Sequence, residues 1–129
     1  MLTAIKLLHT LIWALLAASI LALPVVGLMR QFRRAAILTG LVLLECSVLA
    51  LNGGKCPFTD LAARFTTDRS YNFDIYLPDW LAEYNKLIFG ALFIAGELVV
   101  LKCWLRERYV ASSHIEHSPH EKLTRVRLR

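Results

Sequence analysis

The chain has 129 residues, of which 57% are hydrophobic, and its formal net charge is +5. A water-soluble domain of this size has too high a ratio of surface to volume to bury that much apolar surface, so the composition excludes an ordinary soluble domain. The basic residues lie in short clusters beside apolar runs, a pattern that membrane orientation explains better than nucleic-acid binding does.

Three apolar runs are long enough to cross a membrane as helices. They cover residues 7–29, 35–51 and 87–105, and a spanning helix needs about 20 apolar residues to cross the roughly 30 Å hydrocarbon core. The first run is longer than the apolar region of a signal peptide and ends in basic residues, so we expect it to stay as an uncleaved span. The sequence therefore predicts an all-α integral membrane protein with three transmembrane helices. The expected spans are about 5–29, 35–53 and 84–105.

The distribution of basic residues predicts how these spans are oriented. One cluster follows the first run, and the other lies at the end of the third run or beyond it: Arg30, Arg33, Arg34, Lys102, Arg106, Arg108, Lys122, Arg125, Arg127 and Arg129. The positive-inside rule places both clusters in the cytoplasm, and therefore places the N-terminus and residues 53–85 on the other side of the membrane. Residues 1–110 then form a single membrane domain, and 111–129 form a polar, basic cytoplasmic tail.

The outside segment, 53–85, is long for a loop without structure of its own. Apolar residues in its first half recur at the i, i+3, i+4, i+7 spacing of an amphipathic helix: Phe58, Leu61, Ala62 and Phe65. This spacing predicts a short interfacial helix capped by Thr59 or Asp60. Pro78-Asp79 is typical of a helix start, and we expect the third span to continue directly from it.

Small residues recur at four-residue spacing on two of the spans. They are Ala14, Ala18 and Ala22 on the first and Ala91 and Ala95 on the third. Such spacing lets helix backbones approach closely in lipid, which favours a packed three-helix bundle. The alternative is that a small-residue face docks other membrane subunits or a second copy of the chain.

Three ionisable side chains fall inside the predicted spans, where a polar group is costly and normally faces the protein interior. They are His9, Glu45 and Glu97. Similar depths in the outer leaflet predict a hydrogen bond between His9 and Glu45, with Lys6 as a competing partner. Glu97 lies near the midplane with no visible mate, so we expect it to be protonated or to meet a neighbouring subunit. These groups indicate either a ligand or proton-handling site or hydrogen bonds that fix helix packing.

The most distinctive string is the outside turn that follows the second span. Its notable residues are Asn52, Gly53, Gly54, Cys56, Pro57 and Thr59. Paired glycines suit a helix end, where positive φ is needed, and proline prevents continuation of the helix. The alternative is a shaped turn that presents Cys56 as a reactive thiol, which needs a neighbouring cation such as Lys55. Because His9 is the one histidine expected on that side, the sequence does not favour a catalytic Cys/His pair.

Two further groups of polar residues are only weak candidates for a metal site. The loop residues Asp68, Asn72, Asp74 and Asp79 do not match the twelve-residue calcium loop, so we expect solvated acids and helix caps. The tail histidines His114, His117 and His120 are three apart, but Ser118-Pro119 is expected to interrupt the helix that would stack them. We expect no cofactor.

The chain resembles a family of short, uncharacterised bacterial integral membrane proteins. The resemblance rests on His9 early in the first span, Glu45 in the second and a Gly-x-x-Cys-Pro-x-Thr string from Gly53 to Thr59. In that family the turn typically has leucine where this chain has Phe58. The resemblance implies a three-span topology, a bacterial inner membrane, and a linked constellation of His9, Glu45 and Cys56.

The functional expectation is a small, non-catalytic accessory or structural subunit that packs against partner membrane helices in the lipid bilayer, without binding nucleic acid. One alternative is a small-ligand, lipid or proton-handling protein that uses His9, Glu45 and Cys56. Another is an outside-facing thiol enzyme that uses Cys56.

Overall fold

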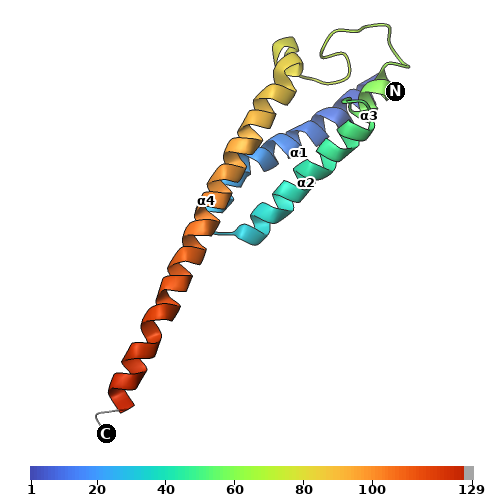
Figure 1. Ribbon diagram of the computed structural model, residues 1–129. Coiled ribbons are helices and arrows are strands. Elements are labelled where there is room, and N and C mark those ends of the chain that lie inside the picture. Colours follow the sequence, from blue (N-terminus) through green and yellow to red (C-terminus); the bar gives the residue numbers. More distant parts are fainter. Residues whose placement is uncertain (127–129) are drawn as a thin grey trace.

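A computed structural model describes the backbone of residues 1–126 and the side chains of residues 1–113. Within these limits the chain forms four helices (Figure 1): α1 (Leu2–Leu28), α2 (Phe32–Leu51), α3 (Pro57–Ala62) and α4 (Asp79–Val126). Helices α1, α2 and the Asp79–Ser113 part of α4 are long and apolar enough to cross a membrane. The prediction of an all-α membrane protein with three spanning helices and one short helix is confirmed.

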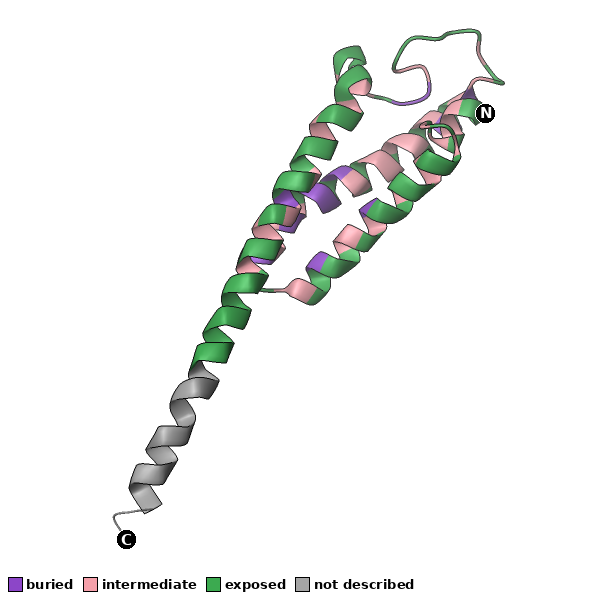
Figure 2. Cartoon of the chain, in the orientation of Figure 1, coloured by how far each residue is buried: buried purple, intermediate pink, exposed green. Residues whose placement is uncertain are grey.

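Helix α1 is the centre of the bundle. It packs against both α2 and α4, whereas α2 and α4 make few contacts with each other. Figure 2 shows the buried residues concentrated along α1, and they include Ile20 and Leu23, which is fully buried. The outer faces of α2 and α4 carry exposed leucines. In a membrane these faces contact lipid, so the apolar exterior needs no further protein to cover it.

Two glycines bring α1 and α4 into close contact. A Cβ added to Gly96 would lie 3.2 Å from the Cβ of Leu23, and a Cβ added to Gly27 would lie 2.9 Å from Cγ2 of Val100. The alanine faces predicted to allow close packing are not used within the chain, because Ala14, Ala18, Ala91 and Ala95 are exposed and Ala22 is only half-buried. The rotation of each helix about its own axis decides which residues face the neighbouring helix, and the spacing of the alanines does not specify it. In this structure the rotation places Gly27 and Gly96, and not the alanines, at the contact.

Positive backbone φ angles end both α1 and α2. The amide of Arg30 (φ 57°) donates to the carbonyl of Gly27, and the amide of Gln31 donates to that of Val26. This is the Schellman arrangement, here with arginine in the left-handed position that normally favours glycine. At the end of α2, Gly53 (φ 63°) and Gly54 (φ 80°) fill the positions predicted from the sequence.

The starts of α3 and α4 differ in how well the sequence predicted them. Helix α3 begins at Pro57 with Cys56 as its N-cap, so the predicted caps Thr59 and Asp60 are wrong. The fixed φ of proline is already helical, which starts the helix earlier. Helix α4 begins at Asp79 as predicted.

The same helix then runs through Ser118-Pro119, where an interruption was expected. Once a long helix exists, each further residue adds a hydrogen bond, and that propagation offsets part of the cost of proline.

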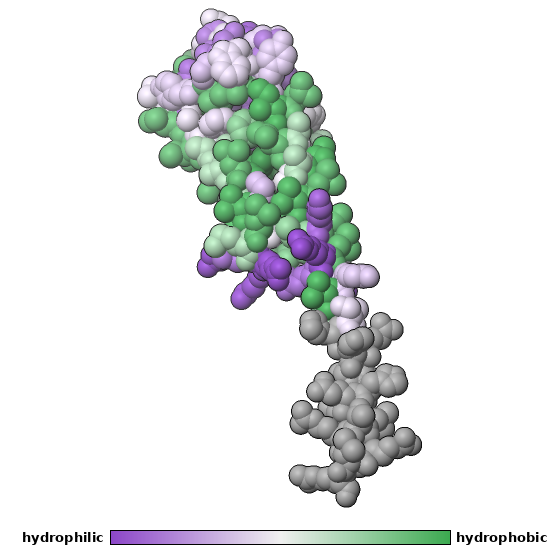
Figure 3. Space-filling view, turned by 90° about the vertical axis from the view of Figure 1, so that its left-hand side faces the viewer, coloured by the Kyte–Doolittle hydropathy of each residue, from purple (hydrophilic) through white to green (hydrophobic). Residues whose placement is uncertain are grey.

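The surface has an apolar belt between two polar ends (Figure 3). One end carries α3 and the loop 63–78, and we call it the α3 end. The other carries the turn between α1 and α2, with Arg30, Arg33 and Arg34 exposed or nearly so, and we call it the basic end. On α4 the guanidinium carbon of Arg108 lies 4.3 Å from the centre of the Trp104 ring. Exposed aromatic residues lie near both ends, with Trp80 and Tyr84 at the start of α4 and Trp104 toward the basic end, as expected at membrane interfaces.

Candidate functional site

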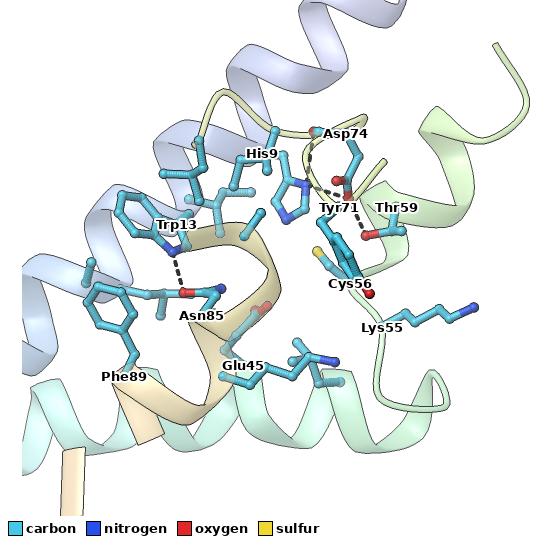
Figure 4. A pocket seen from close by; sticks show the side chains of 18 of the residues that line it. His9, Trp13, Glu45, Lys55, Cys56, Thr59, Tyr71, Asp74, Asn85 and Phe89 are labelled. Atoms are coloured by element: carbon cyan, nitrogen blue, oxygen red, sulfur yellow. Dashed lines mark hydrogen bonds and ion pairs between the residues drawn. The ribbon is translucent and has the colours of Figure 1, made fainter. Parts of the chain in front are cut away.

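A half-open cavity of about 840 Å³ lies between the three long helices near the α3 end (Figure 4). Each long helix contributes one face with residues three or four apart. These are His9, Ile12, Trp13, Leu16, Ala17 and Ile20 from α1; Val42, Glu45, Cys46 and Leu49 from α2; and Ala82, Asn85, Lys86, Phe89, Gly90 and Phe93 from α4. The cavity exists because α2 and α4 both pack on α1 and diverge from each other.

The lining changes from apolar to polar toward the α3 end. The side chains contributed from the middle of the helices, such as Ile20, Val42 and Phe93, are apolar. Nearer the α3 end the lining is rich in charged and polar groups: Lys55, Cys56, Thr59, Asp60, Arg69, Ser70, Asp74 and Lys86. The cavity therefore has an apolar interior and a charged rim.

His9 and Asp74 form the central polar contact of the rim. The Nδ1 of His9 lies 3.2 Å from Oδ2 of Asp74 and 3.2 Å from its backbone carbonyl oxygen. The hydroxyl of Thr59 in α3 donates a hydrogen bond to the same carboxylate. These contacts attach α3 and the loop 63–78, which follows it directly, to α1, which lies far from both in the sequence.

Neighbouring contacts hold the same loop on α1. The backbone amide of Tyr76 donates to the hydroxyl of Thr10 over 3.0 Å. The ammonium of Lys6 lies 4.9 Å from the centre of the Tyr76 ring. The loop is therefore fixed to the first turns of α1 by the contact between His9 and Asp74, a hydrogen bond from a backbone amide and a cation–π contact.

The predicted hydrogen bond between His9 and Glu45 is wrong, and so is Lys6 as the competing partner. His9 binds Asp74, although His9 and Glu45 do line the same cavity. The expectation that Asp74 is a solvated loop acid is also wrong, because only 4% of Asp74 is exposed. The loop folds back over α1 and places the carboxylate of Asp74 against the imidazole of His9.

The electrostatics of Asp74 follow from this position. Burial by itself would raise the pKa of the carboxyl, but hydrogen bonds from His9 and Thr59 outweigh burial and lower the pKa of Asp74 below its ordinary value. Asp68 is fully exposed, and the backbone amide and hydroxyl of Ser70 lower its pKa. Asp68 is thus the solvated loop acid that the sequence predicted, and Asp74 is a buried anion.

The turn that follows α2 forms the wall beside this pair. The amide group of Asn52 donates to the carbonyl oxygen of Lys55 and to Oδ2 of Asp60, each over 3.0 Å. The ammonium of Lys86 in α4 donates to the carbonyl oxygen of Gly54. These bonds hold Cys56 half-buried on the cavity wall, and Figure 4 shows its sulfur beside the imidazole of His9.

Trp13 and Asn85 connect α1 to α4 inside the cavity. The indole N–H of Trp13 donates to Oδ1 of Asn85 over 2.8 Å, and the Trp13 ring meets Phe89 edge-on at 5.4 Å. Because an indole N–H can only donate, it fixes the carboxamide so that the Asn85 NH₂ group points elsewhere. Figure 4 shows that NH₂ group on the cavity side. It is a hydrogen-bond donor available to an occupant.

Glu97 has a partner that the sequence did not reveal. The hydroxyl of Thr39 in α2 donates to Oε1 of Glu97 in α4 over 2.5 Å, in a second groove that opens nearer the basic end. The expectation of a Glu97 without a mate is therefore wrong. The two residues bridge α2 and α4 in the region where these helices otherwise make few contacts.

No metal centre is visible among the side chains that the structure describes, since none of their His, Cys, Asp and Glu residues form a group of three or more suited to an ion. The weak metal candidates His114, His117 and His120 lie outside the described side chains.

Sequence reasoning missed Asp74 and Asn85 as cavity residues. The position of Asn85 could have been predicted from helical spacing, because Asn85 lies one turn from Phe89 on the face of α4 that lines the cavity. Asp74 had no such signal, because it belongs to a loop without periodicity.

Comparison of the chain with protein-family models, curated proteins and solved structures finds no significant match. The resemblance to a bacterial family therefore stays a prediction. What the structure supports directly is a small multi-pass membrane protein with three spanning helices in contact with lipid.

Proposed function

We propose that this protein binds an amphiphilic molecule, a lipid or a small molecule with one apolar chain, in the cavity between α2 and α4. The observation that carries the proposal is the cavity itself, about 840 Å³ with an apolar interior and a charged rim. Ligand sites typically enclose about 300–1,000 Å³ and combine apolar walls with a few placed polar groups. A packed bundle with a structural role alone has no need of such a space.

The polar groups of the rim suit the headgroup of an amphiphile. Lys55, Lys86 and Arg69 supply positive charge, and the NH₂ group of Asn85 supplies a neutral donor. An acyl chain placed between Leu16, Val42 and Phe93 would contact apolar side chains from all three long helices. The headgroup would then lie at the α3 end, at the depth where a membrane lipid has its own polar region.

The proposal includes the orientation of the protein. The exposed arginines of the basic end support a cytoplasmic location for that end, by the positive-inside rule. In this orientation the N-terminus, α3 and the cavity rim face the outside of a bacterial inner membrane, and residues 111–129 form a cytoplasmic tail. Labelling Cys56 in intact cells with a membrane-impermeant maleimide tests the orientation. Labelling only after lysis would contradict it.

Quenching of tryptophan fluorescence tests the binding. Trp13 lines the cavity, whereas Trp80 is 61% exposed and does not line it. A protein that retains only Trp13 (Trp80→Phe with Trp104→Phe) is placed in nanodiscs and titrated with a lysophospholipid that carries a brominated chain. Saturable quenching is expected for Trp13 and only gradual, non-saturable quenching for a protein that retains only Trp80. Equal, non-saturable quenching of both would contradict the proposal.

The accessory-subunit function is a second candidate, favoured by one observation. One face of α2 is exposed from Gly40 to Leu51, through Leu44 and Ser47, with Leu44 63% and Leu51 90% exposed. Lipid or another membrane helix can cover this face. Native mass spectrometry after mild extraction tests it: a monomer that carries lipid but no protein would contradict the subunit role and leave the ligand-binding proposal standing.

A further inference from the structure

Three residues at the cavity rim have the side-chain types and the spatial arrangement of a cysteine–histidine–aspartate catalytic triad. Cys56 precedes α3, His9 lies in the third turn of α1, and Asp74 lies in the loop 63–78. Cys56 and His9 line the same cavity, and Figure 4 shows the sulfur of Cys56 beside the imidazole of His9. Asp74 contacts the opposite part of the ring through Nδ1, at 3.2 Å (Figure 4).

The contacts of His9 determine which ring nitrogen can accept a proton. Nδ1 lies 3.2 Å from two oxygens of Asp74, the carboxylate and the backbone carbonyl, and both can only accept hydrogen bonds. In a neutral imidazole, Nδ1 therefore carries the proton and Nε2 has the free lone pair. This is the tautomer in which a histidine orients toward a carboxylate and takes a proton from a nucleophile.

The surroundings hold this arrangement in place. The side chain of His9 is 13% exposed and that of Asp74 is 5% exposed. The ring of Phe58 lies 6.0 Å from the imidazole, and Thr59 binds the carboxylate of Asp74. The lowered pKa of Asp74 keeps it ionised at neutral pH, so that it can stabilise a positive charge on His9.

We propose that Cys56, His9 and Asp74 transfer an acyl group from a carboxylic ester or thioester carried by an amphiphile bound in the adjoining cavity, with Cys56 as nucleophile and His9 as general base. Asp74 and Thr59 are positioning residues, because they act through His9. The inference rests on the proposed binding function. An acyl carbonyl is the electrophile that a membrane amphiphile presents at its polar end, beside the thiol, and the apolar interior accommodates the chain attached to it.

The reaction balances without a redox partner. For an ester, the thiol proton of Cys56 moves to Nε2 of His9 as sulfur attacks the carbonyl carbon. A carbon–sulfur bond forms and the carbon–oxygen bond to the alcohol breaks, and His9 returns the proton to the departing alkoxide. Water or a second alcohol then gives its proton to His9 and attacks the thioester. The carbon–sulfur bond breaks, and the sulfur of Cys56 recovers the proton.

The chain contains its own control thiol. Cys46 lines the same cavity from α2, and both it and Cys56 are free. Two full-length proteins are compared in phosphatidylcholine nanodiscs, one that retains only Cys56 (Cys46→Ala with Cys103→Ala) and one that retains only Cys46 (Cys56→Ala with Cys103→Ala). The probe is p-nitrophenyl decanoate, and the readouts are the release of p-nitrophenol and the mass of the acylated cysteine.

We expect acylation of Cys56 to be roughly a hundredfold faster than that of Cys46, the size of effect that a positioned general base gives. Asp74→Asn in the Cys56 protein is expected to lower the acylation rate constant at least about tenfold while the half-saturating probe concentration stays the same. Asp74→Glu should recover part of the loss. A purely structural role for Asp74 would change both quantities together.

The results separate failure of the inference from failure of the binding proposal. If Cys56 is acylated no faster than Cys46 while Trp13 shows saturable quenching, the acyl-transfer inference is overturned and the binding function stands. If Trp13 shows no saturable quenching, the binding function fails as well. Should Asp74→Asn fail to fold, Thr59→Val removes one hydrogen bond to the same carboxylate, and an unchanged acylation rate in that variant would contradict the positioning role.

Discussion

The imidazole of His9 and the carboxylate of Asp74 are 3.2 Å apart, although the two residues are separated by 65 positions in the chain. This contact fixes the loop 63–78 on α1 and places Asp74 in a site where it is almost wholly buried. A charged hydrogen bond contributes about 1.5–3 kcal/mol, and a buried anion left without its partner costs more. The attachment of the loop 63–78 to α1 therefore depends on this pair.

Replacing Asp74 should release the loop. In Asp74→Asn the charge is lost, so amide hydrogen exchange across residues 72–76 is expected to become at least about tenfold faster, equivalent to about 1.4 kcal/mol. Asp68→Asn is the matched control, because Asp68 is on the same loop but fully exposed, and its carboxylate accepts hydrogen bonds from the nearby Ser70. Equal protection in both variants would show that the pair does not hold the loop.

Acid should weaken the same contact. The pKa of Asp74 is lower in the folded protein than in the unfolded chain, so its contribution to stability is fully present above the ordinary carboxyl pKa and is lost as the pH falls through the lowered value. Hydrogen exchange of residues 72–76 should thus accelerate in strong acid in the native protein, after correction for intrinsic rates. Asp74→Asn should remove this step, and its persistence in the variant would assign it to another group.

The glycines of the bundle provide a matched test of helix packing. Gly96→Ala and Gly27→Ala put a methyl group against Leu23 and Val100, whereas Gly40→Ala meets open space. Overpacking typically costs about 1–3 kcal/mol, and alanine in an open helical site gains up to about 1 kcal/mol. Thermal unfolding in detergent should show lower stability for the first two variants and equal or higher stability for Gly40→Ala. The same loss in all three would contradict the close approach of α1 and α4.

The Thr39–Glu97 bond should contribute modestly to stability. Thr39→Val keeps the shape of the side chain and removes the hydrogen-bond donor. The contribution of a hydrogen bond between helices to the stability of a membrane protein averages about 0.6 kcal/mol and reaches about 1.7 kcal/mol. Ser47→Ala is the control, since Ser47 bonds to the carbonyl of Leu43 in its own helix. Unfolding by a denaturing detergent should distinguish them, with a measurable loss for Thr39→Val alone. No difference between them would mean that the bond adds nothing to the pairing of α2 and α4.

The sequence was sufficient for the number and approximate position of the spans, because hydropathy and length report directly on the bilayer. It also predicted the glycine turn after α2 and the start of α4 at Asp79, since both depend on local backbone chemistry. The sequence could not predict which face of each helix packs against its neighbour. Ala14 and Ala18 have the spacing of a packing face, but the helix is rotated so that Gly27 makes the close contact.

The site was predictable only where helical spacing determines it. The sequence predicted similar depths for His9 and Glu45, and the structure places both on one cavity. The partner of His9 was not predictable, because Asp74 lies in a loop whose path depends on tertiary contacts such as the bond between Tyr76 and Thr10. Similarly, Thr39 could be matched to Glu97 only once the rotation of α2 was known.

The most direct test of the central claim fills the cavity. Gly90 lines it and has open space where a side chain would project, whereas Gly40 has equally open space but lies in the second groove. In the protein that retains only Trp13, Gly90→Leu and Gly40→Leu are titrated with the brominated lysophospholipid. We predict that Gly90→Leu weakens saturable quenching at least about tenfold, or about 1.4 kcal/mol, and that Gly40→Leu leaves it unchanged. Unchanged saturable quenching in Gly90→Leu would contradict binding in this cavity.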